Sequence, residues 1–166
     1  MGATVTVNKR TVVHGTSEGV VSTFPDVCKT PSPGGPVAVP YPNVACSNDT
    51  SEGSRDVQMD GESIMLRGAY FATSTGDEAG TVGGVVSGTF CGKAEFINYS
   101  FDVAVEGRNV PRQGDSMLQN KRQTANTSPT PEIQPPLPVV GVDFEDEPEG
   151  PWQLVALEQL DEATDD

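Results

Sequence analysis

The stretch that decides the fold runs from Phe24 to Asn43 and reads FPDVCKTPSPGGPVAVPYPN. It holds six prolines and one cysteine in twenty residues. Proline fixes φ and removes a backbone donor, so the stretch is expected to form neither a helix nor a central strand. Apolar residues nevertheless recur along it, which disordered proline-rich spacers lack. They are Phe24, Val27, Val37, Val39 and Tyr41. We therefore expect an ordered, extended segment that wraps around a small core.

Glycine and proline are abundant in the whole chain, with 18 and 14 copies in 166 residues, which is typical of many tight turns. Short segments rich in β-branched residues lie between these turns. Residues 4–7 and 11–14 are expected to pair as a hairpin, and residues 57–66 as a second one around Asp60-Gly61. Glu106-Gly107 supplies a further turn. This pattern predicts an all-β fold with little helix.

The formal net charge of −14 is distributed unevenly along the chain. Residues 1–128 hold thirteen acids and all ten bases, whereas residues 129–166 hold eleven acids and no base. We expect a body over residues 1–125 and a proline-rich, acidic, irregular extension over residues 126–166. The extension is expected to begin as a solvated polyproline II linker and can form a short helix at residues 152–161. The tryptophan and leucines of that helix need a surface to cover, either on a partner or on the body.

The charge pattern and the cysteine count restrict the partners and the compartment. The body has no basic stripe, and an acidic extension opposes binding to nucleic acid, so no nucleic-acid partner is expected. No apolar run approaches the length of a membrane span, and the first residues lack a signal-peptide pattern. We expect the chain in the cytoplasm, at least initially. Three cysteines in such a chain indicate free thiols or metal ligands rather than disulfides.

Five motifs follow one another in order between about residues 5 and 122. They are Thr11-Val12-Val13-His14, Phe24-Pro25-Asp26-Val27-Cys28-Lys29-Thr30-Pro31, Gly34-Gly35-Pro36-Val37 with Pro40-Tyr41-Pro42-Asn43, Ser74-Thr75-Gly76-Asp77-Glu78-Ala79-Gly80, and Gly92-Lys93-Ala94-Glu95-Phe96. Together they resemble the PAAR-like family of spike-tip proteins.

The resemblance implies a small cone-shaped β body that caps and sharpens the trimeric spike of a bacterial contractile injection system. Such systems include type VI secretion systems and phage-tail-like particles. One tip is expected on each spike trimer, and it would help to pierce the target membrane, which it contacts only transiently. The tip would be assembled in the cytoplasm and then delivered outside the cell as part of the injection particle.

The alternative function is an adaptor that loads an effector or other cargo through residues 126–166. A fused toxin is not expected, because the extension is short and shows no catalytic pattern. A Ser-His-Asp triad can be drawn from the single histidine, but no nucleophile elbow accompanies it. Asp77 and Glu78 are expected to accept hydrogen bonds from loop amides and fix a turn. We therefore expect a structural protein without catalytic residues, not an enzyme.

His14 and Cys28 are the candidate metal ligands, because imidazole nitrogen and thiolate sulfur suit zinc in a closed structural site. Tips of the wider family bind a metal near the apex through histidine and cysteine, so the resemblance also implies zinc. Related chains often carry a histidine where this one has Gln119, a poor zinc ligand. Either Cys46 or Cys91 completes the site, or a three-ligand set has lost a member, or no metal binds. Without a metal, His14 is hydrogen-bonded and Cys28 packs in the interior.

Overall fold

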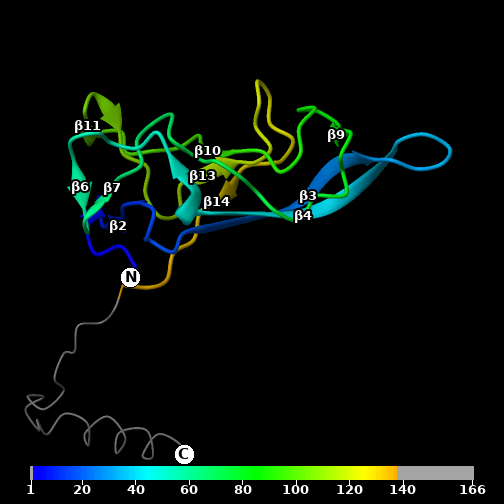
Figure 1. The fold of residues 1–166 in the computed structure, drawn as a ribbon. Helices are drawn as coiled ribbons and strands as arrows, with labels where there is room; N and C mark the ends of the chain where they lie inside the picture. Colours follow the sequence, from blue (N-terminus) through cyan, green and yellow to red (C-terminus); the bar gives the residue numbers. More distant parts are fainter. Residues whose placement is uncertain (1, 138–166) are drawn as a thin grey trace, which may run out of the picture.

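The computed structural model describes residues 2–137 and shows a body built almost wholly of short strands (Figure 1). The strands are β1 (Thr6–Val7), β2 (Arg10–Thr11), β3 (Val20–Thr30), β4 (Val37–Cys46), β5 (Thr50–Ser51), β6 (Gln58–Met59), β7 (Glu62–Ser63), β8 (Tyr70–Phe71), β9 (Gly83–Gly84), β10 (Ala94–Phe96), β11 (Ala104–Val105), β12 (Arg108–Asn109), β13 (Ser116–Leu118) and β14 (Thr130–Pro131). A single 3-10 turn, η1 (Ser47–Asp49), is the helical element of the described part. The expected all-β fold is confirmed. In residues 2–137, no helix has the length and apolar character needed to cross a membrane.

Three tight hairpins gather at one end of the molecule (Figure 1). They are β1–β2, β6–β7 and β11–β12. Each has a two-residue turn with both residues at positive φ, a geometry whose twist matches that of the flanking strands. The φ values are 51° and 64° for Asn8 and Lys9, 55° and 80° for Asp60 and Gly61, and 51° and 73° for Glu106 and Gly107. The hairpins expected at residues 4–14 and 57–66, and the expected Glu106-Gly107 turn, are confirmed.

The three hairpins are copies of one sequence pattern, in which the first, third and eighth positions are apolar. These positions hold Val5, Val7 and Val12 in the first copy, Val57, Met59 and Ile64 in the second, and Val103, Val105 and Val110 in the third. The nine side chains form one apolar cluster together with Leu66. The eighth residue of each copy is fully buried. The hairpins therefore share a small core of their own.

Backbone hydrogen bonds join the three copies into a closed ring. Each copy is bonded to both others through the segment that follows its hairpin. The bonds are Gln113 N to Thr11 O, Arg67 N to Asn109 O and Met65 N to Val13 O, each 2.8 Å. In the first two bonds, the eleventh residue of one copy donates to the seventh residue of another. The first runs from the third copy to the first, and the second runs from the second copy to the third. The repeated pattern and the ring of bonds, in which two of the three junctions are equivalent, together indicate an approximate three-fold arrangement.

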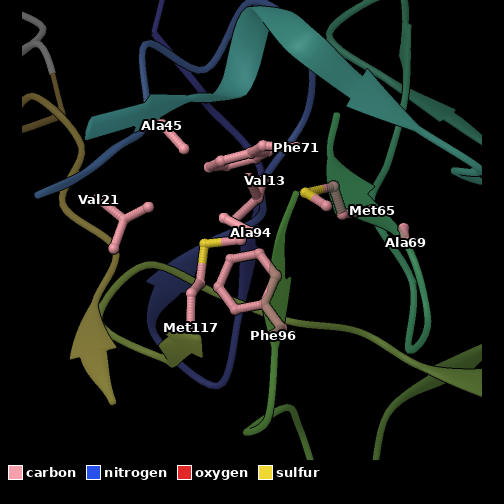
Figure 2. Packing of buried hydrophobic residues seen from close by; sticks show 9 residues of the cluster. All are labelled: Val13, Val21, Ala45, Met65, Ala69, Phe71, Ala94, Phe96 and Met117. Atoms are coloured by element: carbon pink, nitrogen blue, oxygen red, sulfur yellow. The ribbon is translucent and has the colours of Figure 1, made fainter. Parts of the chain in front are cut away.

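The second core has nine buried side chains, against five in the first, and includes residues of a five-stranded antiparallel sheet with the order β14-β13-β10-β8-β5. Figure 2 shows its side chains, which are Val13, Val21, Ala45, Met65, Ala69, Phe71, Ala94, Phe96 and Met117. The rings of Phe71 and Phe96 meet edge to face, with centroids 6.1 Å apart. Most members of this core are small or flexible, so burial there is limited. Polar interactions therefore have a large share in holding the remainder of the body together.

The proline-rich stretch is a long hairpin, β3–β4, that extends away from the body (Figure 1). The prediction of an ordered, extended segment is confirmed, but the segment forms a projecting hairpin and does not wrap around a core. The exclusion of a central strand is also wrong, because β3 lies between β4 and β9. Pro25 is accommodated at a register shift between Thr23 and Asp26, where the ladder is interrupted. Pro40 and Pro42 belong to β4, an edge strand, where proline is tolerated.

Residues 126–137 lie against the body rather than leaving it as a linker. Strand β14 pairs antiparallel with β13, and the side chains of Glu132 and Gln134 are buried. The prediction of a backbone-solvated linker is wrong for this segment, because strand pairing satisfies its backbone groups. The domain boundary near residue 125 stays a prediction. The helix expected at residues 152–161 lies outside the described residues.

Candidate functional site

A thiol and two carboxyl groups meet where the acidic loop before β9 crosses β3. Asp26 and Cys28 are two positions apart on β3 and therefore point to the same face of the strand. Asp77 reaches them from the loop, and the ligand atoms of the three side chains all lie within 4.8 Å of one another. All three residues are fully buried. A Cβ on Gly80 would lie 2.3 Å from Cys28 Cβ, so only glycine lets the loop approach this closely.

Three asparagine side chains donate hydrogen bonds to this group. Asn43 Nδ2 donates to Asp26 Oδ2 at 2.7 Å, and Asn126 Nδ2 donates to Asp26 Oδ1. Asn120 Nδ2 donates both to Asp26 Oδ2 and to Asp77 Oδ2. Buried carboxylates need such donors, since a buried acceptor without a partner is costly. Amides from three distant segments therefore hold the two acids side by side.

The Cys28 thiol lies between the two carboxylates. Its sulfur is 3.6 Å from Asp26 Oδ1 and 3.6 Å from Asp77 Oδ2. Burial, and then the charges of Asp26 and Asp77, raise the pKa of Cys28 to about 12. In the absence of a cation the thiol therefore keeps its proton and donates it to the acids. Cys28 in that state is a poor nucleophile, because the thiolate is the reactive form.

Cys91 lies beside this group, next to Asp77, although its sulfur is not among the ligand atoms that all lie within 4.8 Å of one another. Its backbone N donates to Asp77 at 3.2 Å, and its sulfur is 3.5 Å from Asp77 Oδ1. Burial and the nearby Asp77 raise the pKa of Cys91 to about 11. The residue adopts φ 47°, a left-handed conformation that directs its amide toward the carboxylate. Cys28 and Cys91 thus both contact Asp77.

The group could hold a metal ion. Two carboxylate oxygens and one or two thiolate sulfurs are donor types that Zn²⁺ accepts in tetrahedral sites. A bound cation would replace the thiol protons, since metal binding deprotonates a coordinating cysteine. The chemistry of the donor set therefore fits a metal, and a cation would also neutralise the charge of Asp26 and Asp77, which adds to burial in raising the pKa values of the thiols.

His14 lies elsewhere, in the ring of hairpins. Its backbone pairs with Ile64, its Nε2 is 3.2 Å from Asp60 Oδ2, and its Nδ1 is 3.3 Å from Thr16 Oγ1. Within the described residues, the group of metal-ligand atoms that contains Cys28 does not include His14. Imidazole and thiol, which the sequence suggested as one pair of ligands, thus belong to different clusters.

The other residues considered from sequence also have defined places. Gln119 is buried and donates Nε2 to Val21 O at 3.0 Å, so it forms part of the packed interior. Cys46 is half-buried beside η1 and is not a member of the Asp26 group. Glu78 accepts two bonds from Gly76 N at 2.9 Å, which agrees with the expected role in the turn.

Sequence reasoning missed Asp26 and Asp77 as candidate ligands and did not detect the three-fold repeat. The sequence contains a signal for Asp26 and a signal for the repeat. Asp26 stands two residues before Cys28, the spacing that places side chains on one face of a strand. The repeat is visible as the apolar pattern at Val5, Val57 and Val103 with its following positions. Asp77 required the folded structure, because nothing local links its loop to β3.

The chain belongs to the family described as the toxin PAAR-like domain, whose model matches residues 19–126. The resemblance drawn from the motifs is thereby confirmed. The DNase toxin Tse7 of Pseudomonas aeruginosa is 35% identical to the chain over 116 residues. The matched residues make up 66% of this chain and 30% of the relative. No solved structure matches the chain.

The relative corrects one expectation. The sequence led us to expect that the protein is not an enzyme, but a protein similar over this region is named as a DNase toxin. The expectation rested on the lack of a nucleophile elbow and of a catalytic pattern in the extension, whereas nucleases also work with metal ions held by carboxylates. The lack of a serine triad therefore does not exclude an enzyme in this family.

Proposed function

We propose that the protein is the tip of a contractile injection spike and that its three-hairpin end binds a trimeric spike protein. The observation that carries the proposal is the approximate three-fold ring formed by β1–β2, β6–β7 and β11–β12. A single chain that binds on the three-fold axis of a trimer needs three similar surfaces, one for each subunit. The pattern provides them from one chain, and membership in the PAAR-like family supports the same partner.

The contacts on this face are assigned by position in the pattern. Thr6, Gln58 and Ala104 occupy the second position of each copy, and all three are exposed between buried or half-buried apolar neighbours. The two turn residues of each hairpin are exposed as well. We expect each spike subunit to contact one hairpin through these residues, with one tip on each trimer.

The test is co-purification of the tip with its cognate trimeric spike protein. The triple variant Thr6→Arg, Gln58→Arg and Ala104→Arg should remain folded and lose the complex, because three long charged side chains would separate the surfaces. The matched control is Gly34→Arg in the β3–β4 loop, where an added Cβ meets no atom within 4 Å. Full binding by the triple variant would contradict the proposed contact face.

Zinc is the metal proposed for the buried group, with Asp26, Cys28 and Asp77 as ligands and Cys91 as the fourth. The ligands predicted from sequence were His14 and Cys28, and the two sets can be distinguished. Metal content of the purified protein should fall to background in Cys28→Ser and stay at the wild-type level in His14→Gln. Loss of metal in both variants would favour the original pair.

The compartment and the membrane step belong to the same proposal. The tip would be assembled on its spike in the cytoplasm and leave the cell with the particle, meeting a membrane only while the spike crosses it. The extended, proline-rich β3–β4 hairpin lies away from the three-hairpin end and would lead into the membrane (Figure 1). Particle-mediated delivery of a tagged tip into target cells is the corresponding measurement.

The second candidate function is that of an effector or a cargo-loading protein. The similarity to a DNase toxin supports it, although this chain spans only 30% of that relative's length. Because residues 126–137 are part of the body, the truncation that tests this role should remove residues 138–166 only. Cargo loading should then be lost while spike binding remains. Plasmid cleavage by the purified full chain, with and without added Mg²⁺ or Zn²⁺, tests the nuclease role directly.

A further inference from the structure

Glu132 is a fully buried acid near the end of the described chain. Within residues 2–137, neither of its carboxyl oxygens has a hydrogen-bond partner. The same is true of the adjacent Gln134 Oε1, because the Gln134 amide is turned the other way and donates Nε2 to Val12 O at 3.0 Å. Buried acceptors without donors are costly. A proton on Glu132 would reduce the deficit, since the O–H could donate to Gln134 Oε1 and one carbonyl oxygen alone would remain without a donor.

Among residues 2–137, no basic side chain forms an ion pair with Glu132. Its carboxyl packs over Gly19, where a Cβ would lie 1.9 Å from Glu132 Oε1. Ser47 lies at the same place and uses its hydroxyl to accept from Gly19 N. Asp115 is the neighbouring acid, and its own partners are Arg10 at 2.8 Å and Arg112 at 3.1 Å. These two arginines are bonded to Asp115, while Glu18, beside Gly19 in the chain, is exposed.

Glu132 sits in the middle of a strap that holds the beginning of the C-terminal extension against the body. We define the strap as residues 130–134. Its backbone bonds reach several elements: Ile133 exchanges two bonds with Val20, Glu132 N donates to Asp115 O, and Gly114 N donates to Glu132 O. Strand β14 within it completes the five-stranded sheet. Docking of the strap therefore requires burial of the Glu132 carboxyl.

Ionised and neutral forms of Glu132 differ greatly in the cost of that burial. Burial raises the pKa of Glu132 to about 7, although the neighbouring Gln134 side chain lowers it in part, and the charge of Asp115 adds a smaller increase. When the strap leaves the body the carboxyl is hydrated, and its pKa returns toward the ordinary range. Docking thus binds a proton, and an increase in pH opposes it.

We propose that the strap is a proton-dependent latch, docked while Glu132 is neutral and released when Glu132 ionises. Release undocks residues 130–134 without unfolding the two cores. The direction of the pH dependence follows from the raised pKa of Glu132. Docking of the strap is most stable below the ordinary pKa range of a glutamate, and this stability is lost as the pH rises through the pKa of the docked Glu132. The proposed spike contacts at Thr6, Gln58 and Ala104 lie outside the strap, so the latch can fail while spike binding is retained.

Hydrogen exchange of the full chain between pH 4 and 9, followed by mass spectrometry, tests the latch. The protection factor of residues 130–134, corrected for the intrinsic pH dependence of exchange, should fall by up to about tenfold per pH unit between the ordinary glutamate pKa and the raised value of about 7, and should level off above it. Glu132→Gln, which keeps the shape and removes the charge, should abolish that fall. Asp56→Asn, an exposed acid outside the strap, should retain it.

A second measurement does not depend on any variant. The side-chain carboxyl carbon of Glu132, followed by NMR in the wild-type chain, should titrate with a midpoint well above that of an ordinary glutamate. A flat protection profile in the wild type would overturn the proposal. So would a profile in Glu132→Gln that falls like that of the wild type, or an ordinary titration midpoint.

Discussion

Asn120 donates its side-chain amide to Asp77 Oδ2 at 2.6 Å, although the two residues are 43 positions apart. The same amide also donates to Asp26, so one neutral side chain bridges two buried carboxylates. This arrangement joins the end of β13 to the acidic loop and to β3. It allows both acids to remain buried together whether or not a cation is bound.

Replacement of Asn120 by alanine should therefore destabilise the fold. Asp26 would keep its bonds from Asn43 and Asn126, but Asp77 would lose its side-chain amide donor. We expect a loss of about 2 to 3 kcal/mol in the free energy of unfolding, measured by urea denaturation. Asn48→Ala, at an exposed asparagine, is the control and should change it by less than about 0.5 kcal/mol. Equal effects of the two substitutions would contradict a bridging role for Asn120.

The aromatic pair in the larger core gives a second prediction. Phe71 is fully buried against Phe96, so Phe71→Ala should cost about 3 to 5 kcal/mol of unfolding free energy. Phe101 is 87% exposed, and Phe101→Ala should leave stability nearly unchanged. Thermal denaturation of both variants provides the comparison. A large loss at Phe101 would mean that its ring is covered in solution.

The sequence predicted those parts of the structure that local chemistry determines. Asp60-Gly61 and Glu106-Gly107 indicated their hairpins because few residues tolerate two successive positive φ angles. The motif around Cys28 indicated the family. The candidate site was predicted only in part, because Asp77 reaches β3 through a close approach at Gly80 that no spacing reveals. The strap was misjudged since its prolines suggested solvation, whereas Glu132 shows that it is buried.

Asp60 gives a prediction on the acid stability of the three-hairpin end. Thr4 donates both its hydroxyl and its backbone N to this carboxylate, and these bonds, with a smaller contribution from His14, lower the pKa of Asp60. A depressed folded pKa means that the stabilisation is present above the ordinary aspartate range and is lost as the pH falls through the folded value. In Asp60→Asn, the free energy of unfolding should therefore depend less on pH between pH 2 and 6 than it does in the wild type. An unchanged slope in the variant would exclude Asp60 as its source.

The three-fold pattern predicts a stabilising substitution at Lys9. The fifth position of the pattern is glycine in two copies, Gly61 and Gly107, but is Lys9 in the first, where φ is 64°. A left-handed conformation costs a side-chain-bearing residue about 1 to 2 kcal/mol, and glycine gives back part of that in chain entropy. Because the Lys9 side chain is exposed, Lys9→Gly should raise the free energy of unfolding by about 0.5 kcal/mol.

The matched experiment reverses the change at an equivalent position. Gly107 has φ 73° and open space around its missing Cβ, so Gly107→Ala introduces strain without a clash. It should lower the free energy of unfolding by about 1 kcal/mol. Urea denaturation of both variants and the wild type should show changes of opposite sign in the free energy of unfolding if the hairpins are copies of one turn. Effects of the same sign would show that the first hairpin does not share the geometry of the third.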